Sequence, residues 1–406
     1  MKQTEIGLIP DDWEVNYINN LASITTGNKN TQDKVDNGMY PFFVRSQEVE
    51  RINEYGYDCE GVITAGDGVG TGKIFHYING KFALHQRCYL MYNFKNIDAH
   101  FFYWIFSNKF YERVSAMTAK SSVDSVRKEM ISEMLISYPK SIKEQQRIAK
   151  ALSDVDALIS TTEKLIQKKK NIKQGAMQNL LTGKKRLPGF GPQTKSPAYK
   201  QTELGSIPGD WEIKSIKDFA KVYDGTHQTP HYVDVGIPFY SVENVTANDF
   251  EHTKLVSERE HRFLTSKVKI EKGDILMTRI GSIGDCKYID WEPEASFYVS
   301  LALIKCDTSV DARFISYYSN SLQFKKELEL RSLITAIPQK INLGPISEII
   351  LVLPPKKEQT SIADVLSSMD KEIETLNTKL EKYRNLKTAM MQQLLTAPAY
   401  PKLRLF

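Results

Sequence analysis

The sequence has few features of a membrane, secreted or metal-binding protein. No stretch of its 406 residues approaches the roughly 20 consecutive apolar residues that a membrane-spanning helix requires. Its first residues, MKQTEIGLIPDDWE, include acidic side chains and lack the apolar segment of a secretory signal. The four cysteines include no C-x-x-C pair, which favours reduced thiols over a disulfide framework or a zinc site. We therefore expect a cytoplasmic protein without a metal site.

The sequence also lacks a recognisable catalytic motif. The glycine-rich segment AGDGVGTG, residues 65–72, is followed by Lys73 and by Ile74-Phe75, which are typical of a strand. P-loops and dinucleotide-binding loops lead into a helix, so we expect a tight turn here instead. No Asn/Asp-Pro-Pro-aromatic tetrad of the amino-methyltransferases is present, and no nuclease-like cluster stands out. We expect no catalytic residue and no cofactor bound by this chain.

Composition narrows the class of protein only slightly. A hydrophobic share of 41% and a charged share of 25% are ordinary for a globular protein, and the length predicts two or three domains. The net charge of +5 permits a surface that binds phosphate groups but does not require one.

What the sequence does contain is an internal repeat. Residues 3–15, QTEIGLIPDDWEV, return as QTELGSIPGDWEI at residues 201–213, with nine of thirteen positions identical. Because the offset later changes from 198 to 214 residues, the second copy has extra residues ahead of its glycine-rich turn. The chain is thus one unit of about 200 residues written twice. The segments repeated at an offset of 214 are KEQQRIAKALSDVD (143–156) with KEQTSIADVLSSMD (357–370), MQNLLT (177–182) with MQQLLT (391–396), and VITAGDGVGTGKI (62–74) with LMTRIGSIGDCKY (276–288).

Each copy begins with a globular part, at residues 6–142 and 204–355. Tyr, Phe, Val and Ile are frequent there and are interrupted by turn signals such as DNG, AGDG, INGK and EKGD. We expect an α+β fold with a strongly twisted sheet in each. The predicted strands include KFALHQRCYLMY (81–92) and SFYVSLALIKC (296–306), and the predicted amphipathic helices are AHFFYWIFSNKFYERVSAM (99–117) and ARFISYYSNSLQFKKELELRS (312–332).

Each copy ends in a long helix with a heptad pattern. Apolar residues recur at alternating spacings of four and three, which predicts a coiled coil, and Leu158, Leu165 and Ile172 widen the apolar face of the first helix. We expect the two helices, each about 60 Å long, to pair antiparallel within the chain rather than to dimerise separately. The predicted seam consists of Val155, Ile159, Thr162, Ile166, Lys169, Lys173, Ala176 and Leu180, and of Met369, Ile373, Leu376, Leu380, Tyr383, Lys387, Met390 and Leu394.

These patterns predict six consecutive segments. Pro, Gly, Lys and Ser crowd residues 183–199, which we interpret as a linker, and the end of the chain resembles the start of that linker. The segments are a first globular domain at 1–142, a first spacer helix at 143–182, the linker at 183–199, a second globular domain at 200–355, a second spacer helix at 356–396 and a tail at 397–406.

This order of segments resembles the specificity subunit of type I restriction-modification systems. In that family, each of two variable globular domains is followed by EQ-x-x-IA-x-x-L-S-x-x-D and a long helix that ends in LLTG; here Ala397 replaces the second glycine. The phrases YDGTHQTPHYVDVGIPFYSVENV, GDILMTRIGSIG, YPFFVRSQEV and INGKFALHQRCY are also typical of its target-recognition domains. The helix residues that match the motif are Glu144, Gln145, Ile148, Leu152 and Asp156 in the first copy, and Glu358, Gln359, Ile362, Leu366 and Asp370 in the second.

The resemblance implies a non-catalytic, DNA-binding subunit. Each globular domain would recognise one half of a split, asymmetric site in double-stranded DNA. The paired helices would space the two domains and bind two methyltransferase subunits, through which motor-nuclease subunits join the complex. S-adenosylmethionine, ATP and magnesium would then belong to the partner subunits, and the complex to the cytoplasm.

Polar residues on loops are the candidates for contact with DNA. Arg pairs best with guanine, and Gln or Asn with adenine, although any one of these residues could contact phosphate or only water. KSSVDSVR (120–127) and ITAIPQKIN (334–342) fall at matching places in the two copies with different polar residues, which suits two domains that recognise different sequences. The candidates are Arg45, Lys73, Gln86, Arg87, Ser121, Ser122 and Arg127 in the first domain, and His227, Lys254, Arg279, Ser282, Lys287, Lys340 and Asn342 in the second.

Two other functions remain compatible with the sequence. The chain could be an enzyme in its own right, although the missing motifs count against this. It could also be a coiled-coil scaffold whose globular ends bind proteins, and sequence-selective, salt-dependent DNA binding would separate that function from a specificity subunit.

Overall fold

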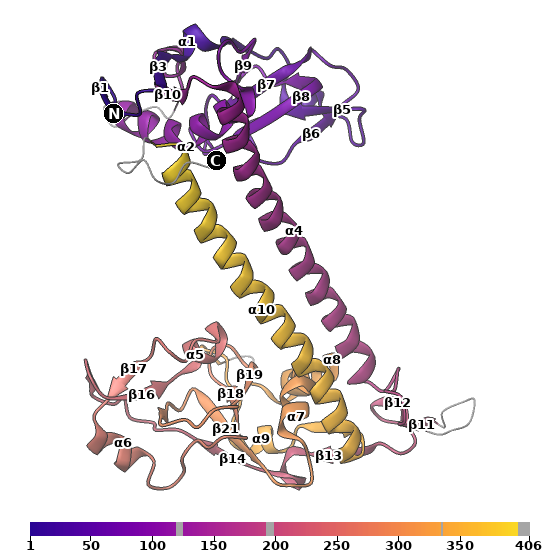
Figure 1. Ribbon diagram of the computed structural model, residues 1–406. Coiled ribbons are helices and arrows are strands. Elements are labelled where there is room, and N and C mark those ends of the chain that lie inside the picture. The colour runs from indigo at the N-terminus through magenta and orange to yellow at the C-terminus, as the bar shows by residue number, and fades with distance from the viewer. Residues whose placement is uncertain (119–124, 192–198, 334–335, 397–406) are drawn as a thin grey trace. The chain divides into compact units, whose positions relative to one another are not determined.

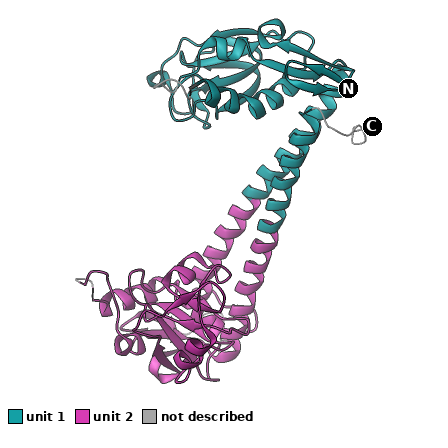
Figure 2. Ribbon diagram, turned by 90° about the vertical axis from the view of Figure 1, so that its left-hand side faces the viewer, with its two compact units in different colours: residues 1–164, 377–406 teal, residues 165–376 magenta. Residues whose placement is uncertain are grey.

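The structure is a computed structural model that describes residues 1–118, 125–191, 199–333 and 336–396. Within it the chain divides into two compact units, one of residues 1–164 and 377–406 and the other of residues 165–376 (Figure 2). Each unit contains one globular domain of strands and helices together with part of both long helices. The predicted α+β class is therefore confirmed.

The first domain is built on a six-stranded sheet in the order β4-β9-β7-β8-β5-β6. The long strand β8 (Phe75–Leu84) joins its two parts, because it pairs antiparallel with β7 (Tyr57–Ala65) along most of its length and parallel with β5 (Tyr40–Phe43) at its end. Helix α2 (Ala99–Thr118) buries most of its aromatic side chains in one core cluster with residues of the sheet. The other elements are β1 (Lys2–Thr4), β2 (Gly7–Ile9), β3 (Trp13–Tyr17), α1 (Ile18–Leu21), β4 (Ser23–Thr26), η1 (Thr31–Asp33), β6 (Glu50–Ile52), β9 (Cys88–Tyr92), α3 (Lys128–Ser132) and β10 (Leu135–Pro139), of which β3 pairs with β10.

The second domain has two four-stranded sheets, in the orders β14-β21-β18-β19 and β15-β17-β16-β20. β19 (Cys286–Tyr288) and β20 (Ser296–Phe297) take the places of the two ends of β8, since the intervening residues leave the sheet. The other elements are β11 (Tyr199–Thr202), β12 (Gly205–Pro208), β13 (Glu212–Ser215), η2 (Ile216–Asp218), β14 (Ala220–Asp224), β15 (Tyr232–Val233), β16 (Ile237–Tyr240), α5 (Val242–Ala247), β17 (Lys254–Val256), α6 (Glu258–Leu264), β18 (Ile275–Thr278), β21 (Leu301–Cys306), α7 (Ala312–Tyr318), α8 (Leu322–Arg331), α9 (Leu343–Ser347) and β22 (Ile350–Leu353).

The extra residues of the second copy lie mainly in one connection. β17 and β18 are joined by residues 257–274, which contain α6, whereas β6 and β7 of the first domain are joined by residues 53–56. The glycine-rich turn that follows β18 therefore occupies the same place as the turn that follows β7, as the alignment of the two copies predicts.

Three predicted elements differ from the observed ones. Residues 81–92 and 296–306 are not single strands, because in each the chain turns between two strands, at residues 85–87 and 298–300. The predicted helix at 312–332 is two helices, α7 and α8, because the hydroxyl of Ser321 accepts a hydrogen bond from the backbone N–H of Phe324 and caps a new helix there. The predicted helix at 99–117 is present as α2.

The long helices α4 (Ile142–Leu180) and α10 (Lys356–Leu394) have 39 residues each, or about 58 Å at 1.5 Å per residue. In the first unit Glu163 of α4 pairs with Arg384 of α10 at 2.9 Å. In the second unit Lys169 pairs with Glu372 at 2.6 Å. Because later residues of α4 meet earlier residues of α10, the pairing is antiparallel and lies within one chain, as predicted (Figure 1).

The predicted seam is confirmed residue by residue, since all sixteen of its members are buried or half-buried. Leu158, Leu165 and Ile172, predicted to widen the apolar face of the first helix, lie outside the seam, with exposed fractions of 45%, 38% and 47%. Each follows a residue of the seam by three or six positions and therefore lies to one side of it on the helix. They form a stripe along α4 that α10 does not cover.

Among the described helices, none is long and apolar enough to cross a membrane.

Candidate nucleic-acid interface

Each domain pairs its glycine-rich turn with one later loop. In the first domain the backbone N–H of Val126 donates to the carbonyl of Gly66 at 2.7 Å. In the second the N–H of Gly281 donates to the carbonyl of Gln339, and the N–H of Ile341 to that of Arg279, both at 2.9 Å. The two loops were predicted to occupy matching places, and where they are described they do so. Each loop pairs with the neighbouring turn through backbone hydrogen bonds. Ser121 and Ser122 lie outside the described residues.

The glycine-rich segment is a turn between two strands, as predicted. β8 begins at Phe75, soon after it, so the segment leads into a strand and not into a helix as a P-loop does. Gly68 has a φ of +84° and Gly72 a φ of +70°, a backbone conformation that side chains with a Cβ rarely adopt. The glycines thus serve the tight reversal of the chain.

Two of the predicted DNA contacts in the first domain meet at this turn. Arg45 and Arg87 each donate to the carboxylate of Asp67, at 2.7 and 2.6 Å. Burial alone would raise the pKa of Asp67, but the hydrogen bonds from the two guanidinium groups outweigh it and lower that pKa. The carboxylate stays ionised and holds two arginines side by side, while the side chain of Arg87 keeps 61% of its surface exposed.

The side chains of the other described candidates in the first domain form no ion pair or hydrogen bond with that of Asp67. The ammonium of Lys73 lies over the ring of Tyr111 at 4.9 Å. Gln86 donates to the side-chain oxygen of Asn30. Arg127 is exposed directly before α3.

In the second domain, two of the candidate lysines lie over aromatic rings, as Lys73 does in the first. Lys254 lies 5.0 Å from the ring of Tyr232. Lys287 donates to Asn248 at 2.7 Å and lies within 5.7 Å of the rings of Phe250 and Trp291. A ring face holds a cation by its quadrupole and leaves part of the ammonium free to bind an anion.

The remaining candidates of the second domain differ in exposure. His227 contacts Asp224 at 2.6 Å, and Ser282 donates to Asp285 at 2.5 Å. Lys340 and Asn342 are exposed on the loop that pairs with the turn.

Arg279 lies inside the domain rather than on its surface. Only 7% of it is exposed, and its Nε donates to the carbonyl of Ile341 at 3.3 Å. Desolvation lowers the pKa of this guanidinium. The geometry favours a role in holding the turn against its neighbouring loop, so Arg279 is the weakest of the candidates for direct DNA contact.

The repeated helix motif attaches each long helix to its own domain. The side chain of Gln145 accepts from the backbone N–H of Asp98 at 2.6 Å and donates to the carbonyl of Pro139 at 2.7 Å. Gln359 makes the equivalent bonds in the second unit, at 3.0 and 2.8 Å. Of the other motif residues, Ile148, Leu152, Ile362 and Leu366 are buried in the two domain cores.

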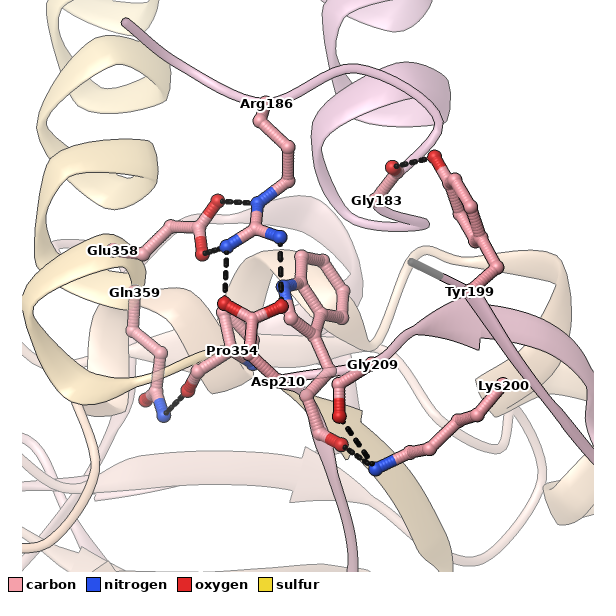
Figure 3. A network of polar contacts seen from close by, with 10 residues as sticks. Gly183, Arg186, Tyr199, Lys200, Gly209, Asp210, Pro354, Glu358 and Gln359 are labelled. Atoms are coloured by element: carbon pink, nitrogen blue, oxygen red, sulfur yellow. Dashed lines mark hydrogen bonds and ion pairs between the residues drawn. The ribbon is translucent and has the colours of Figure 1, made fainter. Parts of the chain in front are cut away.

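A second attachment was not predicted from the sequence. Arg186, in the segment interpreted as a linker, binds Glu358 at 2.5 and 2.6 Å and Asp210 at 2.9 and 2.8 Å (Figure 3). Its guanidinium lies 5.6 Å from the ring of Trp211. Glu358 is fully buried, so this arginine supplies the charge that its carboxylate needs. The repeated phrase IPGDWE, which holds Asp210 and Trp211, was the available signal.

No group of three or more His, Cys, Asp or Glu residues in the described part of the chain is arranged to hold a metal ion. The four cysteines are free, and burial raises the pKa of Cys88 to about 12.

Comparison with known proteins identifies the class. The model of the type I restriction modification DNA specificity domain matches residues 10–173 and 208–382. The chain is 27% identical to the Type I restriction enzyme MjaVIII specificity subunit of Methanocaldococcus jannaschii, covering 96% of this chain and 93% of the relative. It is 25% identical to the Type I restriction enzyme EcoDI specificity subunit of Escherichia coli, covering 95% and 88%.

Among solved structures, the type I restriction-modification S subunit of M. genitalium has the same fold. The TM-score is 0.67 at 14% sequence identity, over 98% of this chain and 99% of that one. The chain therefore belongs to the type I restriction-modification DNA specificity family and contains two copies of the family's domain. Its role is recognition of a DNA target rather than catalysis.

Proposed function

We propose that this chain recognises a split, asymmetric site in double-stranded DNA, one half by each domain. The single observation that supports this most directly is the glycine-rich turn hydrogen-bonded to a later loop. Both domains have this pair, but with different polar side chains on it. The first domain places two arginines on one aspartate there, whereas the second places Lys340 and Asn342 on its loop. A shared frame with unlike polar groups suits two unlike half-sites.

The side chains proposed to contact bases are the exposed members of these groups. The guanidinium of Arg87 suits a bidentate contact with guanine. The side-chain amide of Asn342 suits a bidentate contact with adenine. Lys254 and Lys287, placed over rings, suit contacts with phosphate.

The two long helices are proposed to space the half-sites and to bind two methyltransferase subunits, which in turn bind the motor-nuclease subunits. The stripe of Leu158, Leu165 and Ile172 supports this, because aliphatic side chains repeated every seven residues along a helix suit a packed helical partner. S-adenosylmethionine, ATP and magnesium are assigned to those partners, and the complex to the cytoplasm, where its DNA substrate lies.

An exchange of domains tests the proposal. Replacing residues 200–355 with the equivalent domain of a relative should change one half of the methylated motif and leave the half recognised through residues 1–142 unchanged. Sequencing of modified bases in cells that hold the chain and its methyltransferase subunit gives the motif directly. A change in both halves, or in neither, would contradict independent recognition, and methylation by the purified chain alone would contradict the division of roles.

A further inference from the structure

The same three-residue contact joins the helices in both units. In the first unit the ammonium of Lys387 in α10 binds the carboxylate of Asp156 in α4 and lies 5.0 Å from the ring of Trp104 in α2. In the second unit Lys173 of α4 binds Asp370 of α10 at 2.5 Å and lies 5.2 Å from the ring of Tyr317 in α7. Each contact therefore ties both long helices to the adjacent domain.

The two contacts are related by the duplication with the roles of the helices exchanged. Asp370 stands 214 residues after Asp156, and Lys387 stands 214 residues after Lys173. α4 supplies the aspartate in one unit and the lysine in the other. The aromatic partners are fixed as well: the indole N–H of Trp104 donates to Ser153 at 3.2 Å, and the hydroxyl of Tyr317 donates to Asp370 at 2.7 Å and lies 3.2 Å from the hydroxyl of Ser367. Ser153 and Ser367 both belong to the repeated motif.

The lysines occupy positions of an otherwise largely apolar seam. Their side chains are 21% and 27% exposed, so a misplaced ammonium would lose both its counter-charge and part of its water. A shift of α10 along α4 by seven residues keeps the apolar pattern in contact. In either direction, however, it would set Asp156 against Leu380 or Leu394 and Asp370 against Ile166 or Leu180. A polar residue at one seam position is known to specify register in this way.

We propose that Lys173 and Lys387 are positioning residues that select one register of α4 against α10. In that register each lysine meets an aspartate of the other helix and an aromatic ring of the adjacent domain, so the same contacts also attach the domain to both helices. Its consequence for DNA rests on the proposed function: the selected register fixes the spacer between the two half-sites.

Methionine tests this without opening the seam, because it keeps the length of lysine and removes the charge. The variant Lys173→Met/Lys387→Met is compared with Lys168→Met/Lys382→Met, which changes two exposed lysines also related by 214 residues. Register is measured with a short thiol crosslinker in the full chain, its native cysteines replaced by serine. Glu163→Cys with Arg384→Cys reports the native register. Glu163→Cys with Asn377→Cys and Glu163→Cys with Met391→Cys report shifts of seven residues in the two directions.

In the unaltered and control seams we expect only the native pair to crosslink. In the Lys173→Met/Lys387→Met seam one of the shifted pairs should crosslink at least about tenfold more than in the control, because the two ion pairs that favour the native register are lost. The melting temperature should stay equal or rise, a combination that a merely stabilising role would not give. If neither shifted pair crosslinks, the inference is overturned. Asp156→Asn/Asp370→Asn removes the same ion pairs without changing side-chain size, and its register is judged by the same rule if the methionine variant does not fold.

The motif methylated in cells separates this inference from the proposed function. With the methionine variant and the methyltransferase subunit, the spacer should lose its single length while both half-sites stay the same. A single spacer length together with a shifted register would contradict the proposed helix ruler but not the register selection. Absence of any chain-dependent motif in the unaltered protein would contradict the proposed function alone.

Discussion

The side-chain oxygen of Gln145 accepts a hydrogen bond from the backbone N–H of Asp98 at 2.6 Å, which ties the start of α4 to the start of α2. The nitrogen of the same side chain donates to the carbonyl of Pro139, so one buried amide satisfies two backbone groups of its domain. Gln359 does the same in the second unit. Within the repeated motif, these two glutamines therefore attach each long helix to its own domain.

Replacing Gln145 with Leu should destabilise the first unit. The substitution leaves a donor and an acceptor unpaired in a dry site, at about 1–3 kcal/mol for each group. Chemical denaturation should show the loss for Gln145→Leu and for its counterpart Gln359→Leu. Gln146→Leu, at an exposed position beside it, should stay close to the unaltered protein. An equal loss of stability for Gln145→Leu and Gln146→Leu would contradict the attachment role of Gln145.

Replacing Arg186 with Met should cost about 3–5 kcal/mol, the penalty expected when one partner of a buried ion pair is removed. The reason is that the side chain of Glu358, fully buried, would be left without the arginine it is paired with. Arg186→Met with Glu358→Gln should recover part of the loss, because the buried charge is then gone. Lys185→Met, a neighbouring exposed lysine, is the control. If the double variant is no more stable than Arg186→Met, the ion pair is not the cause.

The acid stability of the second unit should depend on Asp210. Hydrogen bonds from Arg186 lower the pKa of this carboxyl below its usual 3.8 in the folded protein. A lowered folded-state pKa adds stability that is present above pH 3.8 and is lost as the pH falls through the folded value. Asp210→Asn should therefore flatten the decline of stability below that pH. Denaturation curves recorded from neutral to acid pH measure the free energy of unfolding. If its decline at low pH is the same for Asp210→Asn, other carboxyls control the acid stability.

Replacing Arg87 with Ala should weaken recognition of the first half-site only, by about 1–3 kcal/mol if the contact is bidentate to a base. Competition binding with DNA altered in one half-site at a time measures the difference. Arg87→Lys should recover little if the contact is bidentate, and most of the affinity if the partner is a phosphate. Lys150→Ala, on the exposed face of α4, is the matched control. A loss that is equal for both half-sites would make Arg87 a general phosphate contact.

Replacing Leu165 and Ile172 with Ser should weaken assembly with the methyltransferase subunit while leaving the free chain folded. Both side chains are exposed, so little apolar area is lost within the chain itself. Co-purification and the melting temperature of the free chain separate the two effects. Thr161→Ser and Lys168→Ser, on exposed positions of the same helix, provide the comparison. Normal assembly of the double variant would place the partner elsewhere.

Part of the candidate site could be predicted from the sequence and part could not. Gln145 and Gln359 were found through the repeat, and the turn at residues 65–72 through the strand pattern after it. Arg45 and Arg87 were proposed separately, but nothing in the sequence indicated that Asp67 joins them, because they lie on different strands and turns. Arg279 looked like an exposed loop residue, and only the packed neighbours at residues 300 and 341 show why it is buried.

The sequence by itself determined the duplication, the two long helices, their seam and the tight turn, because each depends on periodicity or on residues close together in the chain. The tertiary structure decided which polar groups meet. Arg186 reaches Glu358 across 172 residues of sequence, and Lys387 reaches Asp156 across 231. Lys173 and Lys387 look like defects in a heptad pattern until the aspartate and the aromatic ring beside each one are known. A charge in such a seam is tolerated only where its counter-charge lies, and that place depends on the packing of both helices against a domain.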